Sequence, residues 1–103
     1  MWTPESIAQL LAEENPDALL AEGFEDAFLG VVRRCGQPSV AAYSYELGVA
    51  TLVAREKMTY EEAEEWMEFN VVGAWMGPGT PAWICSGDLS AVATSPSKKD
   101  KRN

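Results

Sequence analysis

Carboxylates on one stretch of the chain are the side chains whose type and spacing first suggest chemistry. Glu61, Glu64, Glu65 and Glu68 recur three and four residues apart, which places them on one face of a helix. A face of this kind is typical of a solvated helix surface. It is equally suited to docking a basic protein partner. The sequence leaves both interpretations open.

Polar side chains after this acidic stretch suggest a second kind of site. Asn70 lies between Phe69 and the valines at 71 and 72, where we expect a buried carboxamide that needs hydrogen-bond partners. Backbone groups of the loop 77–80 are the predicted partners, so that Asn70 would pin this loop against the helix. A rival hypothesis makes Glu68, Asn70 and Thr80 the polar lining of a pocket for a small molecule or a substrate. The predicted structural corner consists of Asn70, Gly73, Trp75, Gly77, Thr80 and Pro81.

Several kinds of catalytic machinery are missing from the sequence. There is no histidine, which removes the commonest general base and metal ligand. The two cysteines, Cys35 and Cys85, are too few for a zinc site without histidine, and no glycine-rich phosphate loop follows a predicted strand. We therefore predict no catalytic residue, no metal site and no cofactor, and a protein that is not an enzyme.

Length and charge limit the class of protein further. The 103 residues suffice for one domain, predicted over 1–94, and the basic segment 95–103 is predicted to be a disordered tail. Residues 1–94 hold four of the eight basic residues and 15 of the 16 acidic ones, so their net charge is −11. Such a body repels phosphate backbones, which makes nucleic acid a disfavoured partner. No signal peptide or membrane-spanning run is recognisable, so we expect a cytoplasmic protein with reduced thiols and no membrane contact.

The elements that must position these residues follow from capping and periodicity. Helix starts are predicted at Thr3-Pro4, after Asn15, at Ser44 and at Thr59, where Glu62 completes a capping box. The predicted helices are the first one, a short turn through residues 19 and 20, one over 45–56, and one from 60 to about 75 that Gly77 ends. In the helix over 45–56, the side chains expected to face inward are Leu47, Ala50, Val53 and Ala54.

Three apolar stretches complete the predicted fold. Strands are expected at 27–32, 39–43 and 82–85, with a bulge or close neighbour at Gly30. The prediction is a two-layer α+β domain: a three-stranded, mainly antiparallel sheet packed with about four helices. A sheet this narrow leaves an edge uncovered, which would allow a homodimer.

The segment from Glu68 to Pro81 has the pattern Glu-Phe-Asn-x-x-Gly-Ala-Trp-x-Gly-x-x-Thr-Pro, and the segment 58–63 precedes it. In these residues the chain resembles a family of small, uncharacterised proteins encoded by tailed bacteriophages and prophages. The resemblance extends over about residues 22–83, although the family usually has an acid where Ser44 stands.

This family has no assigned activity, so the resemblance implies a phage-infected bacterium as the setting and no reaction. Together with the charge pattern, it favours an accessory protein that binds a host or phage protein and modulates a host process or defence. The alternatives are the small-molecule or enzymatic site at Glu68, Asn70 and Thr80, and a structural or self-assembling phage protein.

Overall fold

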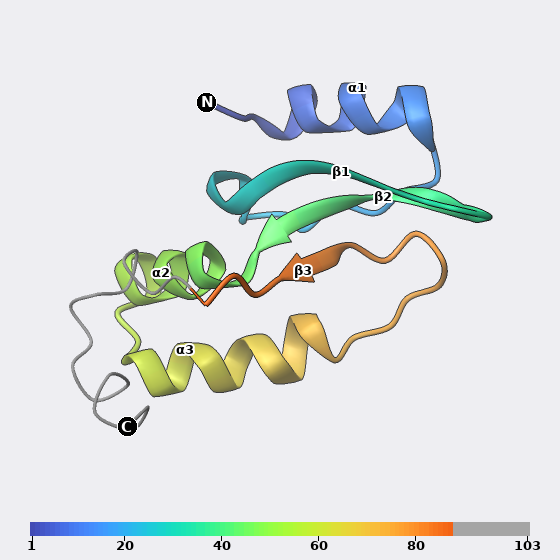
Figure 1. The fold of residues 1–103 in the computed structure, drawn as a ribbon. Helices are drawn as coiled ribbons and strands as arrows, with labels where there is room; N and C mark the ends of the chain where they lie inside the picture. The colour runs from blue at the N-terminus through green and yellow to red at the C-terminus, as the bar shows by residue number, and fades with distance from the viewer. Residues whose placement is uncertain (88–103) are drawn as a thin grey trace.

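The computed structural model describes residues 1–87, and the predicted tail lies outside them. The chain forms three α-helices, two short helical turns of other types and three strands (Figure 1). In chain order these are α1 (Pro4–Glu14), the 3₁₀ turn η1 (Glu25–Ala27), β1 (Phe28–Arg34), β2 (Gln37–Ser44), α2 (Tyr45–Glu56), α3 (Tyr60–Met67), the π-helical turn η2 (Glu68–Val72) and β3 (Ala82–Ile84).

The helices begin where the capping signals predict. Thr3, Ser44 and Thr59 each accept a hydrogen bond from a backbone N–H of the first helical turn. The Glu62 carboxylate also accepts the backbone N–H of Thr59, at 2.9 Å, which completes the predicted capping box. These side chains satisfy donors that have no partner inside the helix, and the predicted bounds of α2 are confirmed.

The segment 16–23 is not the predicted short helix, because two of its central backbone donors bind partners elsewhere in the fold. The N–H of Leu19 donates to the Gly79 carbonyl and the N–H of Ala21 donates to the Tyr43 hydroxyl, both at 3.0 Å. The only helical turn near this segment is η1, which begins at Glu25. The prediction of about four helices is therefore only partly correct.

The sheet has the strand order β1-β2-β3 and is mixed. The hairpin of β1 and β2 is antiparallel as predicted, and its register shifts next to Gly30, where a bulge was expected. In contrast, β3 runs parallel to β2, with Tyr43 opposite Trp83. The chain travels back along α2 and α3 before it enters β3, and this return makes the third strand parallel rather than antiparallel.

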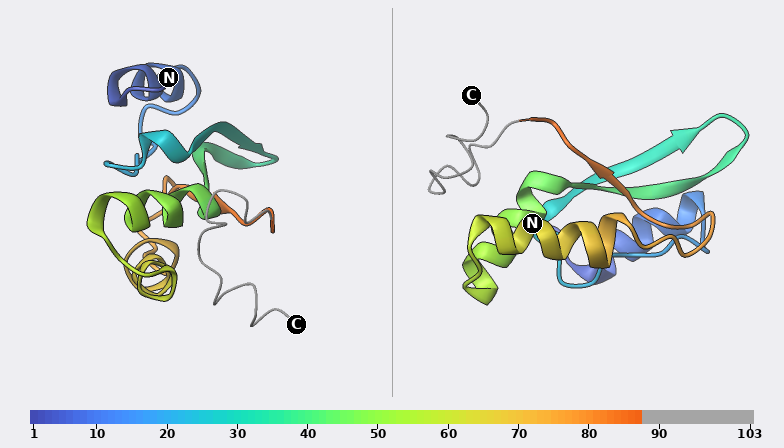
Figure 2. Two further views of the ribbon diagram at one scale, coloured as in Figure 1. Left: turned by 90° about the vertical axis from the view of Figure 1, so that its left-hand side faces the viewer. Right: turned by 90° about the horizontal axis from the view of Figure 1, so that it is seen from below.

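The helices and the sheet form two layers, with α1, α2 and α3 on the same side of the sheet (Figure 2). One buried cluster joins them, to which α1 contributes Ile7 and Leu11 and α3 contributes Ala63 and Met67. The sheet contributes Phe28, Ala41 and Tyr43, which share one face because side chains alternate along a strand.

The buried face of α2 matches the predicted one in part, because Ala50 and Val53 are half-buried against the core. Val49 and Leu52 are buried, whereas Leu47 and Ala54 are exposed. Tyr45 and Gly48 are buried as well, so four buried positions of α2 follow the helical spacing 45, 48, 49 and 52. A Cβ at Gly48 would lie 2.9 Å from the Met67 methyl carbon, so glycine allows α2 and α3 to approach closely.

Candidate functional site: an apolar groove beside an acidic hollow

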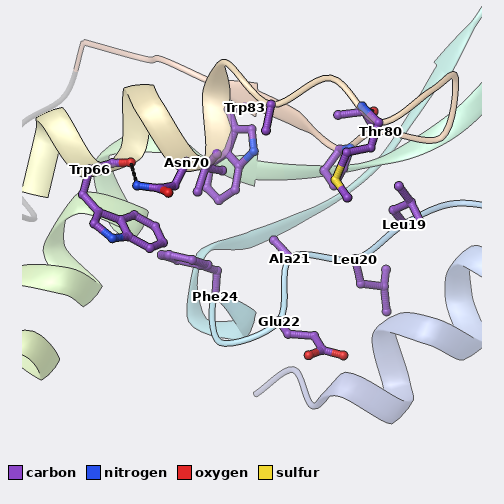
Figure 3. Close-up of a pocket in the computed structure, with 13 residues that line it drawn as sticks. Leu19, Leu20, Ala21, Glu22, Phe24, Trp66, Asn70, Thr80 and Trp83 are labelled. Atoms are coloured by element: carbon purple, nitrogen blue, oxygen red, sulfur yellow. Dashed lines mark hydrogen bonds between the residues drawn. The ribbon is translucent and has the colours of Figure 1, made fainter.

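An apolar groove opens between the segment 19–24, the end of α3 with η2, and the loop that leads into β3 (Figure 3). Its volume is about 280 Å³. We call it the aromatic groove, and its lining consists of Leu19, Leu20, Ala21, Glu22, Phe24, Trp66, Asn70, Val71, Ala74, Met76, Thr80, Pro81 and Trp83.

Packing of aromatic rings holds part of the lining of this groove in place. The Trp83 ring stacks on Tyr43 with centroids 5.1 Å apart, and Phe24 meets Trp83 edge-on at 5.6 Å. The Arg55 guanidinium lies over the Phe24 ring at 5.7 Å and donates to the Gly23 carbonyl. Because these contacts tie the groove to β2, β3 and α2, its shape is set by the fold rather than by one loop.

Next to the groove, η2 and the following residues expose several large apolar side chains. Phe69 is 84% exposed, Trp75 74% and Met76 68%, and apart from Met1 no large apolar side chain of residues 1–87 is more exposed. We call Phe69, Val72, Trp75 and Met76 the apolar ridge. Phe69 and Val72 lie within η2, and Trp75 and Met76 follow its end at Gly73. All four are exposed, unlike Ala63 and Met67 on the core face of α3.

The four acids of the predicted surface are not equivalent in the structure. Glu65 and Glu68 are exposed, whereas Glu61 and Glu64 are half-buried. Glu64 and Glu68 lie toward the first turn of α2, where both carboxylates raise the pKa of Tyr45 after burial, which is the larger cause. The predicted single acidic surface is therefore divided between two sides of α3.

Glu65 belongs to a second depression, which we call the acidic hollow. It has a volume of about 420 Å³ and is lined by Glu62, Glu65, Trp66, Phe69 and Asn70. Trp66 and Asn70 line both depressions. The structure thus brings a pair of carboxylates and two aromatic rings to the edge of the aromatic groove.

The predicted role of Asn70 is wrong. Its side chain is exposed, and its amide donates to the Trp66 carbonyl of its own helix at 3.1 Å rather than to the loop 77–80. That loop is closed by Thr80, whose hydroxyl accepts from Met76 N–H and donates to the Gly77 carbonyl. The loop is therefore held by Thr80, which lies within it, and not by Asn70 on the helix as predicted.

The predicted structural corner is also only partly packed. The helix ends at Gly73 instead of Gly77, and Gly73 N–H donates to the Glu68 carbonyl at 3.0 Å. Trp75 projects into solvent, and Pro81 is half-buried against the groove. Of the alternative ligand site, Asn70 and Thr80 share the groove, but Glu68 does not line it.

Sequence reasoning missed one buried charged residue, Glu46 at the first turn of α2. It is 6% exposed, and its carboxylate accepts hydrogen bonds from Ser86 N–H, Ser86 Oγ–H and Gly87 N–H at 3.1–3.3 Å. Burial, followed by the charges of Glu46 and Glu68, raises the pKa of the neighbouring Cys85 thiol. An acid at a helix start is a common solvated capping residue, so the sequence carried no signal for this contact.

The cysteines and acids of the described residues offer no further site. Cys35 and Cys85 are both exposed free thiols. Within residues 1–87 no group of three or more acids and cysteines is arranged to hold a metal ion. Over the same residues, no helix has the length and apolar character needed to cross a bilayer.

Comparison with known proteins gave no match to a protein-family model, to a curated protein or to a solved structure.

Proposed function

We propose that this protein acts by binding another protein, and that the apolar ridge together with the aromatic groove is the contact surface. The observation that carries the proposal is the exposure of Phe69, Trp75 and Met76 in a domain that is otherwise strongly acidic on its surface. Large apolar side chains exposed to water lower solubility unless a partner covers them. Aromatic residues and methionine are also enriched where proteins bind each other.

The resemblance to phage proteins supports a setting for this activity. In that setting the chain is an accessory protein in the bacterial cytoplasm, its partner is a host or phage protein, and binding modulates a host process or defence. The negative net charge of residues 1–94 supports a partner with a basic surface, because opposite charges speed association.

Affinity capture with matched variants tests the proposal. The wild-type chain is immobilised as a bait and the proteins that it captures are compared with those captured by a Phe69→Ala/Trp75→Ala bait. This variant lacks two ridge side chains that contribute little to the core. The control is Leu29→Ala/Ile84→Ala, which removes two other exposed apolar side chains, from β1 and β3. We expect the wild type and the control to retain the same specific protein, and the ridge variant to lose it.

Retention of the same proteins by all three baits would contradict the proposal. A measurement of molar mass over a range of concentrations separates the remaining alternative, because a self-assembling protein would use the ridge to bind a second copy. A mass that stays at one chain, 11.2 kDa, leaves the ridge available for a different protein.

A further inference from the structure

We infer that the site recognises a short basic–apolar segment of the partner, with a large apolar side chain in the aromatic groove and an arginine in the acidic hollow. The inference rests on the proposed function and names the chemistry of the partner. It comes from the way the two depressions join at the Trp66 ring, with an apolar lining on one side and carboxylates on the other.

The groove is suited to an apolar anchor of limited size. Its volume of about 280 Å³ equals that of roughly nine water molecules in the liquid, enough for one or two large side chains. Its apolar lining includes Trp83, Val71, Ala74 and Pro81. Removing these apolar side chains from contact with water lowers the free energy, so an apolar side chain of the partner is favoured there.

The hollow is suited to a guanidinium group. Glu65 supplies a carboxylate, and Trp66 and Phe69 supply ring surfaces within the same depression. Glu62 adds a second negative charge while one of its oxygens caps α3 through Thr59 N–H. Arginine can bind a carboxylate through two parallel hydrogen bonds and stack on an aromatic ring, which a lysine ammonium cannot do equally well.

Charge complementarity selects this occupant over an uncharged apolar one. Glu22 lies in the lining of the groove, and Glu62 and Glu65 lie in the hollow, so an acidic segment would be repelled from both ends of the site. Because one indole ring borders both depressions, the two anchors must be near neighbours. Side chains three or four residues apart on a helix, about 6 Å between Cβ atoms, meet this requirement.

Selection from a displayed library of random 12-residue peptides tests the inference with the full chain as bait. We expect the enriched peptides to contain arginine within four residues of Leu, Met, Phe or Trp. Replacing either residue by alanine should weaken binding about tenfold, as measured by calorimetry on synthetic peptides. Enrichment of acidic or uncharged peptides, or of none, would overturn the inference.

A pair of charge variants locates the arginine. Glu65→Gln should weaken the arginine peptide about tenfold and leave its arginine-to-alanine form unchanged, since the two changes remove the same interaction. Glu13→Gln removes an equal charge from exposed α1, outside groove and hollow, and should have no effect. Equal losses in the two variants would mean that only net charge matters and would overturn the assignment.

The two proposals can fail separately. A capture experiment that depends on Phe69 and Trp75, combined with peptides that bind regardless of Glu65, would retain the protein-binding function and reject the arginine-containing segment. Capture of the same protein with and without Phe69 and Trp75 would reject the proposed function itself.

Discussion

Tyr45 and Glu46 stand next to each other at the start of α2, and the fold buries both side chains. Glu46 is compensated by three hydrogen bonds from Ser86 and Gly87. The Tyr45 hydroxyl is buried without a well-formed hydrogen bond to any of residues 1–87. Burial and, after it, the nearby carboxylates of Glu64 and Glu68 raise the pKa of Tyr45 above its ordinary value.

The first prediction concerns this hydroxyl. Tyr45→Phe removes a buried polar atom that gains little in the folded state, so we expect the free energy of unfolding to stay equal or rise by roughly 1 kcal/mol. Tyr43→Phe is the matched control, because the Tyr43 hydroxyl accepts the Ala21 N–H at 3.0 Å and its loss should cost about 1 kcal/mol. Urea denaturation of both variants measures the two changes in the free energy of unfolding. A larger loss for Tyr45→Phe than for Tyr43→Phe would show that the Tyr45 hydroxyl is well bonded.

The second prediction concerns the ion pair between α1 and β1. Arg33 donates two hydrogen bonds to the Glu14 carboxylate, at 2.6 and 2.9 Å, and this contact lowers the pKa of Glu14. A lowered folded-state pKa stabilises the fold above the unfolded-state pKa, and the contribution disappears as the pH falls through the lowered value.

Glu14→Gln should therefore be less stable than the wild type at neutral pH and equally stable in strong acid. Because Arg33 is largely exposed, the difference at neutral pH should be small. Urea midpoints at the two pH values measure it, with Glu13→Gln as a control at an exposed position of the same helix. A difference that persists in strong acid would mean that Glu14 acts through packing and not through its charge.

At the scale of elements, η2 connects the core helix α3 to the exposed ridge. The turn is closed by Gly73, whose N–H reaches back five residues to the Glu68 carbonyl. A Cβ at position 73 would lie 2.8 Å from that carbonyl oxygen, which is backbone and cannot move aside. Glycine is therefore required for this turn to close.

We predict that Gly73→Ala lowers the free energy of unfolding by roughly 1–3 kcal/mol, because the new methyl group forces the turn apart. Asn70→Ala, an exposed change in the same turn, should alter it by less than about 0.5 kcal/mol. Denaturant unfolding of both variants measures the effect. If Gly73→Ala is as stable as the wild type, the turn does not need glycine for its closure.

Features that depend on a few adjacent residues were predictable from the sequence. The caps at Thr3, Ser44 and Thr59 and the bounds of α2 were correct, since a cap is decided by residues within one helical turn. The hairpin was correct for the same reason, because its two strands are neighbours in the chain.

Features that depend on distant partners were not predictable. The parallel direction of β3 follows from the path of α2 and α3, and the extended course of Leu19 follows from its bond to Gly79. At the candidate site, the sequence identified the helix with its acids and the loop. It placed Asn70 in the core and Trp75 in a packed corner, because helical periodicity cannot anticipate a π-helical turn.

At the scale of the whole molecule, a negatively charged domain exposes the apolar ridge. The charge of residues 1–94 and the ridge act over different distances. The charge favours approach of a basic surface over about a Debye length, near 10 Å at moderate salt. The ridge and groove act at contact by excluding water. Long-range attraction by charge combined with apolar contact at short range is typical of a surface that binds a specific protein.

Site-specific photo-crosslinking in the native cells tests this account most directly. A crosslinking side chain is placed at position 69 on the ridge or, as a control, at position 29 on β1, two exposed apolar positions on different elements. We predict a discrete crosslinked product with another protein from position 69 and none from position 29. Products of equal yield from both positions, or none from position 69, would contradict the claim that the ridge binds a protein partner.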